Sequence, residues 1–145
     1  TVPHAAWRGM RATAGVVAET LRLYPGAWWF AREAARDTGL GGVPLRRGST
    51  VIVAPWLFHR DPRWWDAPGE WRPGRPPPRA RDAYMPFGAG PRACVGMALS
   101  FLELQVVAAT FAGAFALGVA PSCPDRPRPR ASVTLQPDPG LAVTL

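Results

Sequence analysis

Apolar residues follow a helical spacing in two separate parts of the chain. Residues 16–25 carry apolar side chains along one helical face and then meet Pro25-Gly26, which predicts a short helix that ends there. Residues 95–117 are apolar at almost every position, which predicts a longer helix that is buried on all sides. Residues 1–15 show no clear pattern.

Between these two predicted helices, the sequence pattern is typical of strands and loops. Residues 28–58 contain the β-branched run 50–53 and turn signals at Gly41-Gly42 and Arg47-Gly48, so they predict a small antiparallel sheet. Residues 59–86 are rich in Pro, Arg and Trp, and the three consecutive prolines 76–78 exclude regular structure. This segment should follow the surface as a meander held by its tryptophans.

The tail, residues 118–145, alternates between apolar and polar positions. The turn sequence 137–140 lies within this alternation, and the pattern predicts a closing hairpin. The alternating apolar residues are Val133, Leu135, Leu141, Val143 and Leu145. We find no internal repeat, and the 145 residues suit a single partial domain that is mainly α-helical with small antiparallel β-sheets.

The apolar segment 95–117 is also long enough to span a membrane. Glu103 would then lie inside the bilayer, at a cost of about 2.5–3.5 kcal/mol on insertion scales. We therefore favour a helix in a protein core and expect no membrane partner.

The formal net charge is +7, which would ordinarily suggest nucleic acid as a partner. All 17 basic residues are Arg, and Ala, Gly, Pro and Trp are abundant, so the basicity is also what GC-rich codons would produce. No recognition motif supports a nucleic-acid-binding module, which stays as the less favoured alternative. The two cysteines have no paired spacing and no secretory leader precedes them, which favours the reducing cytoplasm.

One cysteine stands where chemistry would be expected. Cys94 follows the glycine-rich segment 86–93 and precedes the predicted buried helix. Free N–H groups at a helix N-terminus stabilise a thiolate and can donate hydrogen bonds to its sulfur. Gly88 and Gly96 allow close approach of a flat ligand, and Arg92 can neutralise a carboxylate of that ligand.

Three other interpretations of this segment compete. A lone Cys is most often a small buried apolar residue. The spacing Gly88-x-Gly90 could belong to a dinucleotide-binding turn, but no apolar strand precedes it and Pro91 interrupts it. A structural zinc site needs further ligands, and Cys123 has none nearby in the sequence.

Residues 87–96 match, position by position, the pattern Phe-Gly-x-Gly-x-Arg-x-Cys-x-Gly, and so resemble the haem-thiolate loop of the cytochrome P-450 family. Two further segments resemble this family in the same order. Glu19 and Arg22 correspond to its Glu-x-x-Arg on the K helix, and Arg75 to the second Arg of its meander. On a helix Glu19 and Arg22 share one face, so the three side chains can form a structural triad.

The resemblance covers about residues 16–145 and implies the C-terminal part of the cytochrome P-450 fold. It implies residues 16–25 as a K-like helix, 28–58 as the sheet, 59–86 as the meander, 87–96 as the haem-thiolate loop and 95–117 as an L-like helix. The implied cofactor is haem b (iron protoporphyrin IX), with Cys94 as the metal ligand. The other implied cofactor-binding residues are Arg92, Arg32, Phe87, Gly88 and Gly96.

Two departures from the family pattern are visible. Gly74 stands where the family usually has an acidic residue, which weakens the assignment of Arg75. Nothing in the chain resembles the long I helix or the regions that form the substrate pocket, so no catalytic residue is assigned. His59 is interpreted as a structural hydrogen-bonding residue.

The implied function is monooxygenation, in which one oxygen atom from O₂ enters a small organic substrate. A ferredoxin or flavin reductase would supply electrons, and an acidic partner could dock on Arg79 and Arg81. The alternative is a truncated haem-binding fragment without catalytic activity, because haem needs two walls and the distal wall is absent.

Overall fold

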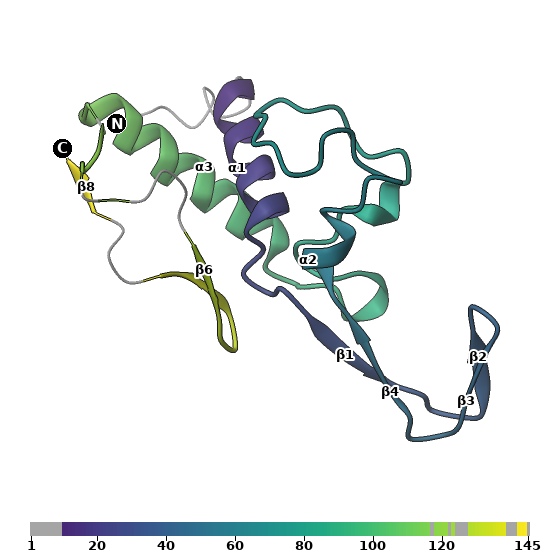
Figure 1. Ribbon diagram of the computed structural model, residues 1–145. Helices are drawn as coiled ribbons and strands as arrows, with labels where there is room; N and C mark the ends of the chain where they lie inside the picture. Colours follow the sequence, from purple (N-terminus) through teal and green to yellow (C-terminus); the bar gives the residue numbers. More distant parts are fainter. Residues whose placement is uncertain (1–9, 117, 122, 124–127, 139–141, 145) are drawn as a thin grey trace.

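The computed structural model of the protein describes residues 10–116, 118–121, 123, 128–138 and 142–144. Two helices, α1 (Arg11–Leu23) and α3 (Met97–Ala114), pack against each other at its centre (Figure 1). The described residues also form four small two-stranded antiparallel sheets and a long loop. The expected class, mainly α with small antiparallel sheets, is confirmed.

Helix α1 begins at Arg11, earlier than the expected start at residue 16. Its N-cap residue, Met10, makes no side-chain capping bond, and no apolar stripe marks the first turn, so the sequence offered no start signal. Val17 and Leu23 face the core, and the helix ends at Leu23, with Tyr24 as its C-cap immediately before the buried Pro25.

The strand region forms two ladders along one projecting arm. Strand β1 (Phe30–Glu33) pairs with β4 (Thr50–Val53), and β2 (Thr38–Leu40) pairs with β3 (Val43–Leu45) at the far end of the arm (Figure 1). Gly41 and Gly42 join β2 to β3 with φ of 57° and 81°, which glycine adopts without strain.

The meander leaves the sheet through the short helix α2 (Pro55–Phe58) and returns past the 3-10 helix η2 (Arg81–Ala83). Trp65 and Ala83 are buried, and Cζ of Arg22 lies 5.1 Å from the Trp65 ring centroid, so Trp65 anchors this irregular segment against α1. The core lies between α1 and the meander, and it encloses the polar side chains Glu19, Arg22 and His59 as well as apolar ones.

Helix α3 follows the 3-10 helix η3 (Gly90–Arg92) and differs from the expectation in one respect. Its residues are apolar on all sides, yet none of them is buried. The prediction of a buried helix was therefore wrong for this chain, because α1 covers only part of the α3 surface. Length and composition would also allow α3 to cross a membrane, but a soluble core helix satisfies the same test.

The tail forms two further ladders within its described residues. Strand β5 (Gly118–Val119) pairs with β8 (Val143–Thr144), and β6 (Pro129–Ala131) pairs with β7 (Leu135–Pro137). The predicted turn at 137–140, together with Leu141 and Leu145, lies partly or wholly outside the described residues.

Candidate functional site

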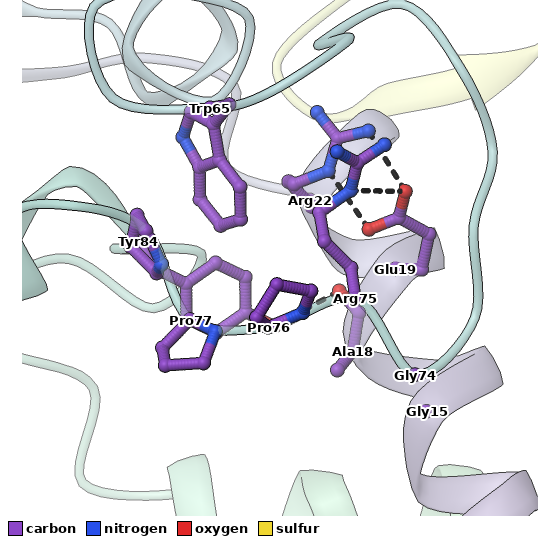
Figure 2. A pocket seen from close by; sticks show the side chains of 11 residues that line it. Gly15, Ala18, Glu19, Arg22, Trp65, Gly74, Arg75, Pro76, Pro77 and Tyr84 are labelled. Carbon is purple, nitrogen blue, oxygen red and sulfur yellow. Dashed lines mark hydrogen bonds and ion pairs between the residues drawn. The ribbon is translucent and has the colours of Figure 1, made fainter.

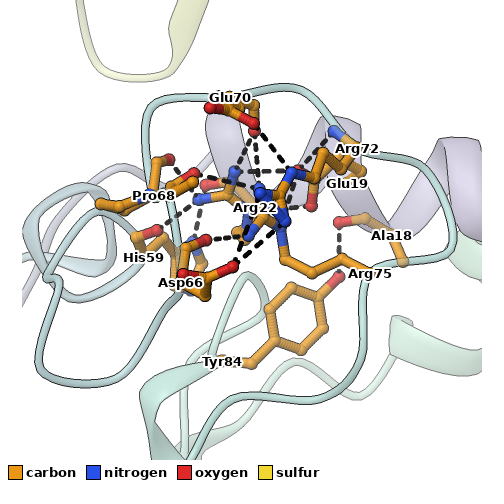
Figure 3. Close-up of polar contacts among 11 residues, drawn as sticks. Ala18, Glu19, Arg22, His59, Asp66, Pro68, Glu70, Arg72, Arg75 and Tyr84 are labelled. Carbon is orange, nitrogen blue, oxygen red and sulfur yellow. Dashed lines mark hydrogen bonds and ion pairs between the residues drawn. The ribbon is translucent and has the colours of Figure 1, made fainter.

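Glu19 and Arg22 form a buried, two-pronged ion pair on α1. Their spacing of three residues places both side chains on one helical face. Nε of Arg22 donates to Oε2 of Glu19 at 2.8 Å, and Nη2 donates to Oε1 at 2.9 Å (Figure 3). The relative exposure is 3% for Glu19 and 1% for Arg22, so the pair is shielded from solvent.

The remaining N–H groups of Arg22 reach the meander. Nη1 donates to the carbonyl oxygens of His59 at 2.6 Å and Pro68 at 2.8 Å, and Nη2 donates to that of Glu70 at 3.0 Å. Together with the two bonds to Glu19, these contacts occupy all five N–H donors of the guanidinium. Arg22 thus fastens the loop to the helix.

Arg75 approaches the same carboxylate from the meander. Its Nε donates to Oε1 of Glu19 at 3.1 Å, and its Nη2 donates to the carbonyl oxygens of Ala67 and Glu70. The backbone N–H of Arg72 also donates to Oε1 of Glu19, at 3.0 Å. The structure therefore brings together the three residues that the sequence placed in a triad (Figure 3).

The carboxylate of Glu19 is held in its charged form. Burial raises its pKa, but the hydrogen bonds from Arg22, Arg72 and Arg75 and the charge of Arg22 outweigh burial and lower the pKa below the ordinary value. The two arginines more than balance the single negative charge of the buried carboxylate, and their hydrogen bonds favour its ionised form.

A cavity of about 290 Å³ lies beside the triad, between α1 and the proline run (Figure 2). Trp65, Tyr84 and residues 76–78 line it on the meander side, and residues of α1 line it on the other side. The hydroxyl of Tyr84 donates to the carbonyl oxygen of Ala18 at 3.0 Å, and burial raises its pKa. The polar side chains that line this cavity all have hydrogen-bond partners: Glu19, Arg22, Arg75 and Tyr84. The cavity therefore resembles a space left by packing more than a reaction site.

The Cys94 loop is shaped by two glycines and by backbone hydrogen bonds. Gly88 and Gly90 have φ of 77° and 72°, a region that disfavours residues with side chains. The N–H of Cys94 donates to the carbonyl oxygen of Phe87 at 2.9 Å, which closes the loop. Cys94 itself is exposed.

The junction between this loop and α3 differs slightly from the expectation. The helix begins at Met97 with Gly96 as its N-cap, whereas the sequence suggested a start at residue 95. The N–H of Met97 donates to the carbonyl oxygen of Cys94 at 3.3 Å. A Cβ atom added to Gly96 would lie 3.8 Å from the sulfur of Cys94, so a side chain at this position would contact the thiol.

The other cofactor-binding candidates lie on different elements. Phe87 packs edge-on against Phe101 of α3, with ring centroids 5.2 Å apart. Arg92 ends η3 and is exposed, while Arg32 lies on β1 with its guanidinium 4.6 Å from the Phe30 ring centroid. Their approach to a common ligand stays a prediction.

Sequence reasoning missed the contribution of the backbone to this site. Carbonyl oxygens of the meander accept most of the arginine hydrogen bonds, and a backbone acceptor leaves no residue-specific signal. Arg60 was also missed: it lies 3.3 Å from the Trp56 ring centroid and donates to the carbonyl oxygen of Leu23 at the end of α1. Over the described residues, no three His, Cys, Asp or Glu side chains cluster as a metal site would require.

Comparison with known proteins gives a consistent result. The family model described as Cytochrome P450 matches residues 2–144. Cyclooctatin synthase of Streptomyces melanosporofaciens is 37% identical over 130 residues, covering 86% of this chain and 28% of the relative. Cytochrome P450 714C3 of Oryza sativa subsp. japonica is 39% identical over 143 residues, covering 94% of this chain and 28% of the relative.

A third relative extends the comparison to animals. Thromboxane-A synthase of Macaca fascicularis is 41% identical over 96 residues, which cover 63% of this chain and 18% of the relative. The chain spans less than a third of the length of these curated relatives.

Proposed function

The chain belongs to the cytochrome P450 family, and from that premise we propose that it is the haem-binding portion of a monooxygenase. Cys94 is the proposed axial ligand of the iron. The observation that carries this proposal is an exposed cysteine at the end of a glycine-shaped loop whose sequence matches the family pattern throughout.

The residues around Cys94 suit a flat macrocycle. The sulfur belongs to an exposed residue, and Gly96, where a Cβ atom would lie 3.8 Å from the sulfur, puts no side chain beside it. Val95, Met97 and Leu99 follow the cysteine as exposed apolar residues that could contact a porphyrin. Haem b bound through a thiolate would supply O–O bond cleavage, because the thiolate donates electron density to the iron.

This chain's own residues would hold and orient the cofactor. The bond from the Cys94 N–H to the Phe87 carbonyl fixes the loop backbone on either side of the motif. Arg92 and Arg32 are proposed to pair with the two haem carboxylates, and Phe87, Gly88 and Gly96 to form the surface nearest the sulfur. Glu19, Arg22 and Arg75 hold the meander, which leads into this loop, against α1.

The proposed partners follow from the same family assignment. A small organic substrate and an electron-donating ferredoxin or flavin protein would be needed, whereas nucleic acid and membrane are not expected.

Arg79 and Arg81 are exposed, and an acidic electron donor could dock there. Replacing both by Glu should slow electron transfer and weaken its salt dependence; unchanged rates would exclude this surface. The proposed location is the cytoplasm.

A second candidate function has its own supporting observation. The chain matches less than a third of its relatives' length, and no residue of its apolar helix α3 is buried. A fragment of this kind could bind haem without turning over substrate. Oxygenation assays on the purified 145-residue chain separate this alternative from an active enzyme.

Haem reconstitution tests the principal proposal. The reduced, carbon-monoxide-bound protein should give the long-wavelength Soret band of a thiolate ligand, and Cys94→Ala should abolish it. Cys123→Ala is the matched control, since it removes the other cysteine and should retain the band. A band that survives Cys94→Ala would overturn the assignment of the ligand.

A further inference from the structure

His59 is a buried side chain that the proposed function leaves unused. Its relative exposure is 0%, and its ring stacks on Tyr84 with centroids 5.4 Å apart and meets Trp65 edge-on at 6.4 Å. An imidazole in such a place must satisfy both ring nitrogens, because an unpaired buried polar group costs about 1–3 kcal/mol.

The two nitrogens are satisfied by two distant parts of the chain. Nδ1 lies 2.9 Å from the carbonyl oxygen of Arg22, in the last turn of α1. The backbone N–H of Met85 donates to Nε2, also at 2.9 Å. The ring therefore forms a bridge between the helix that carries the ion pair and the segment that leads into the Cys94 loop.

These partners fix the tautomer. The N–H of Met85 can only donate, so Nε2 must be unprotonated, and the proton must lie on Nδ1, where it is donated to the carbonyl oxygen of Arg22. Burial and the charges of Arg22 and Arg60 lower the pKa of His59 to about 4. The ring therefore remains neutral in this form near neutral pH.

Met85 is connected to Cys94 by a short series of backbone hydrogen bonds. The N–H of Gly88 donates to the carbonyl oxygen of Met85 at 3.0 Å, and the N–H of Cys94 donates to that of Phe87 at 2.9 Å. Pro86, between them, is buried. The first of these bonds closes a turn and the second closes the Cys94 loop. A displacement of Met85 would therefore also displace the sulfur.

We propose that His59 is a positioning residue for the Cys94 loop, which it ties at the N–H of Met85 to the carbonyl oxygen of Arg22 at the end of α1. This inference rests on the proposed function in one respect, which is that the loop held by His59 presents Cys94 to the haem iron. The carbonyl oxygen of His59 is held separately by Arg22, so a side-chain substitution changes the ring contacts alone.

Two substitutions at His59 test the two hydrogen bonds of its ring separately. In His59→Gln, the amide oxygen can take the place of Nε2 and accept from Met85, while the bond to Arg22 is lost. In His59→Asn, the amide nitrogen can take the place of Nδ1 and donate to Arg22, while the N–H of Met85 loses its acceptor. Both variants remove the ring, and Asn is smaller than Gln by one methylene, so a role limited to filling the core predicts a modest difference in overall stability but no selective change at the N–H of Met85.

Amide hydrogen exchange at Met85 is the first measurement, made on the haem-free protein. We expect exchange at Met85 to be roughly tenfold faster in His59→Asn than in the wild type, and to be close to the wild-type rate in His59→Gln. The second measurement is the carbon-monoxide spectrum of the haem-loaded protein. His59→Asn should lose part of the thiolate-type band, and His59→Gln should keep it.

Equal exchange rates and equal spectra in the two variants would overturn the proposal. If the wild type lacks a thiolate-type band, the proposed function fails, yet the exchange data still decide whether His59 holds Met85. Should both variants fail to fold, ¹⁵N spectra of the wild type decide it. A coupling between Nε2 of His59 and the Met85 nitrogen across the hydrogen bond supports the proposal, and a protonated Nε2 excludes it.

Discussion

The Nε atom of Arg75 lies 3.1 Å from Oε1 of Glu19, although 56 positions separate the two residues in the sequence. This contact, together with the bonds that Arg22 makes to Pro68 and Glu70, joins the irregular meander to α1. The meander has few regular backbone ladders of its own, so its course depends on these side-chain bonds. The stability of the loop region should accordingly respond to changes in the ion-pair network.

Replacing Glu19 by Gln should destabilise the protein by about 3–5 kcal/mol. The amide keeps the shape of the side chain but leaves the buried guanidinium groups of Arg22 and Arg75 without their counter-charge. Urea unfolding measures the loss. Glu70→Gln is the matched control, because that carboxylate is exposed and its pair with Arg72 should contribute only about 0–1 kcal/mol. Similar losses in both variants would contradict the importance of the buried pair.

Replacing Gly15 by Ala should also be destabilising, despite the better helix propensity of Ala. A Cβ atom at Gly15 would lie 2.7 Å from the backbone nitrogen of Gly74, and neither backbone can yield cheaply. We expect a loss of about 1–3 kcal/mol in the free energy of unfolding.

Gly113→Ala provides the comparison for this prediction, because Gly113 is also helical and a Cβ atom there would meet nothing within 4 Å. It should stabilise the protein by up to about 1 kcal/mol. Opposite signs at the two glycines would support the close approach of α1 and the meander, whereas stabilisation by both substitutions would exclude it.

Local patterns predicted part of this arrangement, and only part. The spacing of Glu19 and Arg22 sufficed to place them on one face, and the glycine-bearing turns and the β-branched run at 50–53 predicted the sheet region. Arg75 was found through its resemblance to a family segment, since nothing in its immediate neighbours indicates a partner 56 positions away. The carbonyl oxygens of Pro68 and Glu70 could not be predicted, because every residue has such an acceptor.

The burial of α3 could not be predicted either. Its composition indicates a helix suited to an apolar environment, but burial depends on what surrounds the helix, and α1 is the only helix with which it has extensive contact among the described residues. The start of α3 was similarly hidden: Val95 continues the apolar pattern, while Gly96, as the N-cap, sets the first helical residue at Met97.

The stability of the protein should fall as the pH is lowered from about 6.5 to about 4. The pKa of His59 drops from its ordinary value of 6.5 to about 4 on folding, so in this range the unfolded chain binds a proton that the folded chain excludes. Stability therefore rises with pH across this range, by at most about 1.4 kcal/mol per unit. Below about 4.5, protonation of Glu19, whose pKa is also lowered, adds a further loss.

Urea unfolding at several pH values, in the wild type and in His59→Gln, measures this dependence. The variant lacks the titrating ring, so its free energy of unfolding should change less between pH 6.5 and 4. Parallel curves for the two proteins would show that His59 does not remain neutral in the fold.

The exposed surface of α3 should cause the 145-residue chain to self-associate. Leu99 is 67% exposed, and Met97, Val107 and Phe111 are also exposed on the same helix, which gives a larger apolar area than isolated surface residues would. Leu99→Glu should reduce association, because pairing of two copies through this surface would bury the charge of the new carboxylate. Sedimentation velocity over a range of concentrations measures the average mass. Val133→Glu is the control: Val133 is 92% exposed in the connection between β6 and β7, and the substitution changes net charge by the same amount. An equal fall in mass for both variants would assign the association to charge and not to α3.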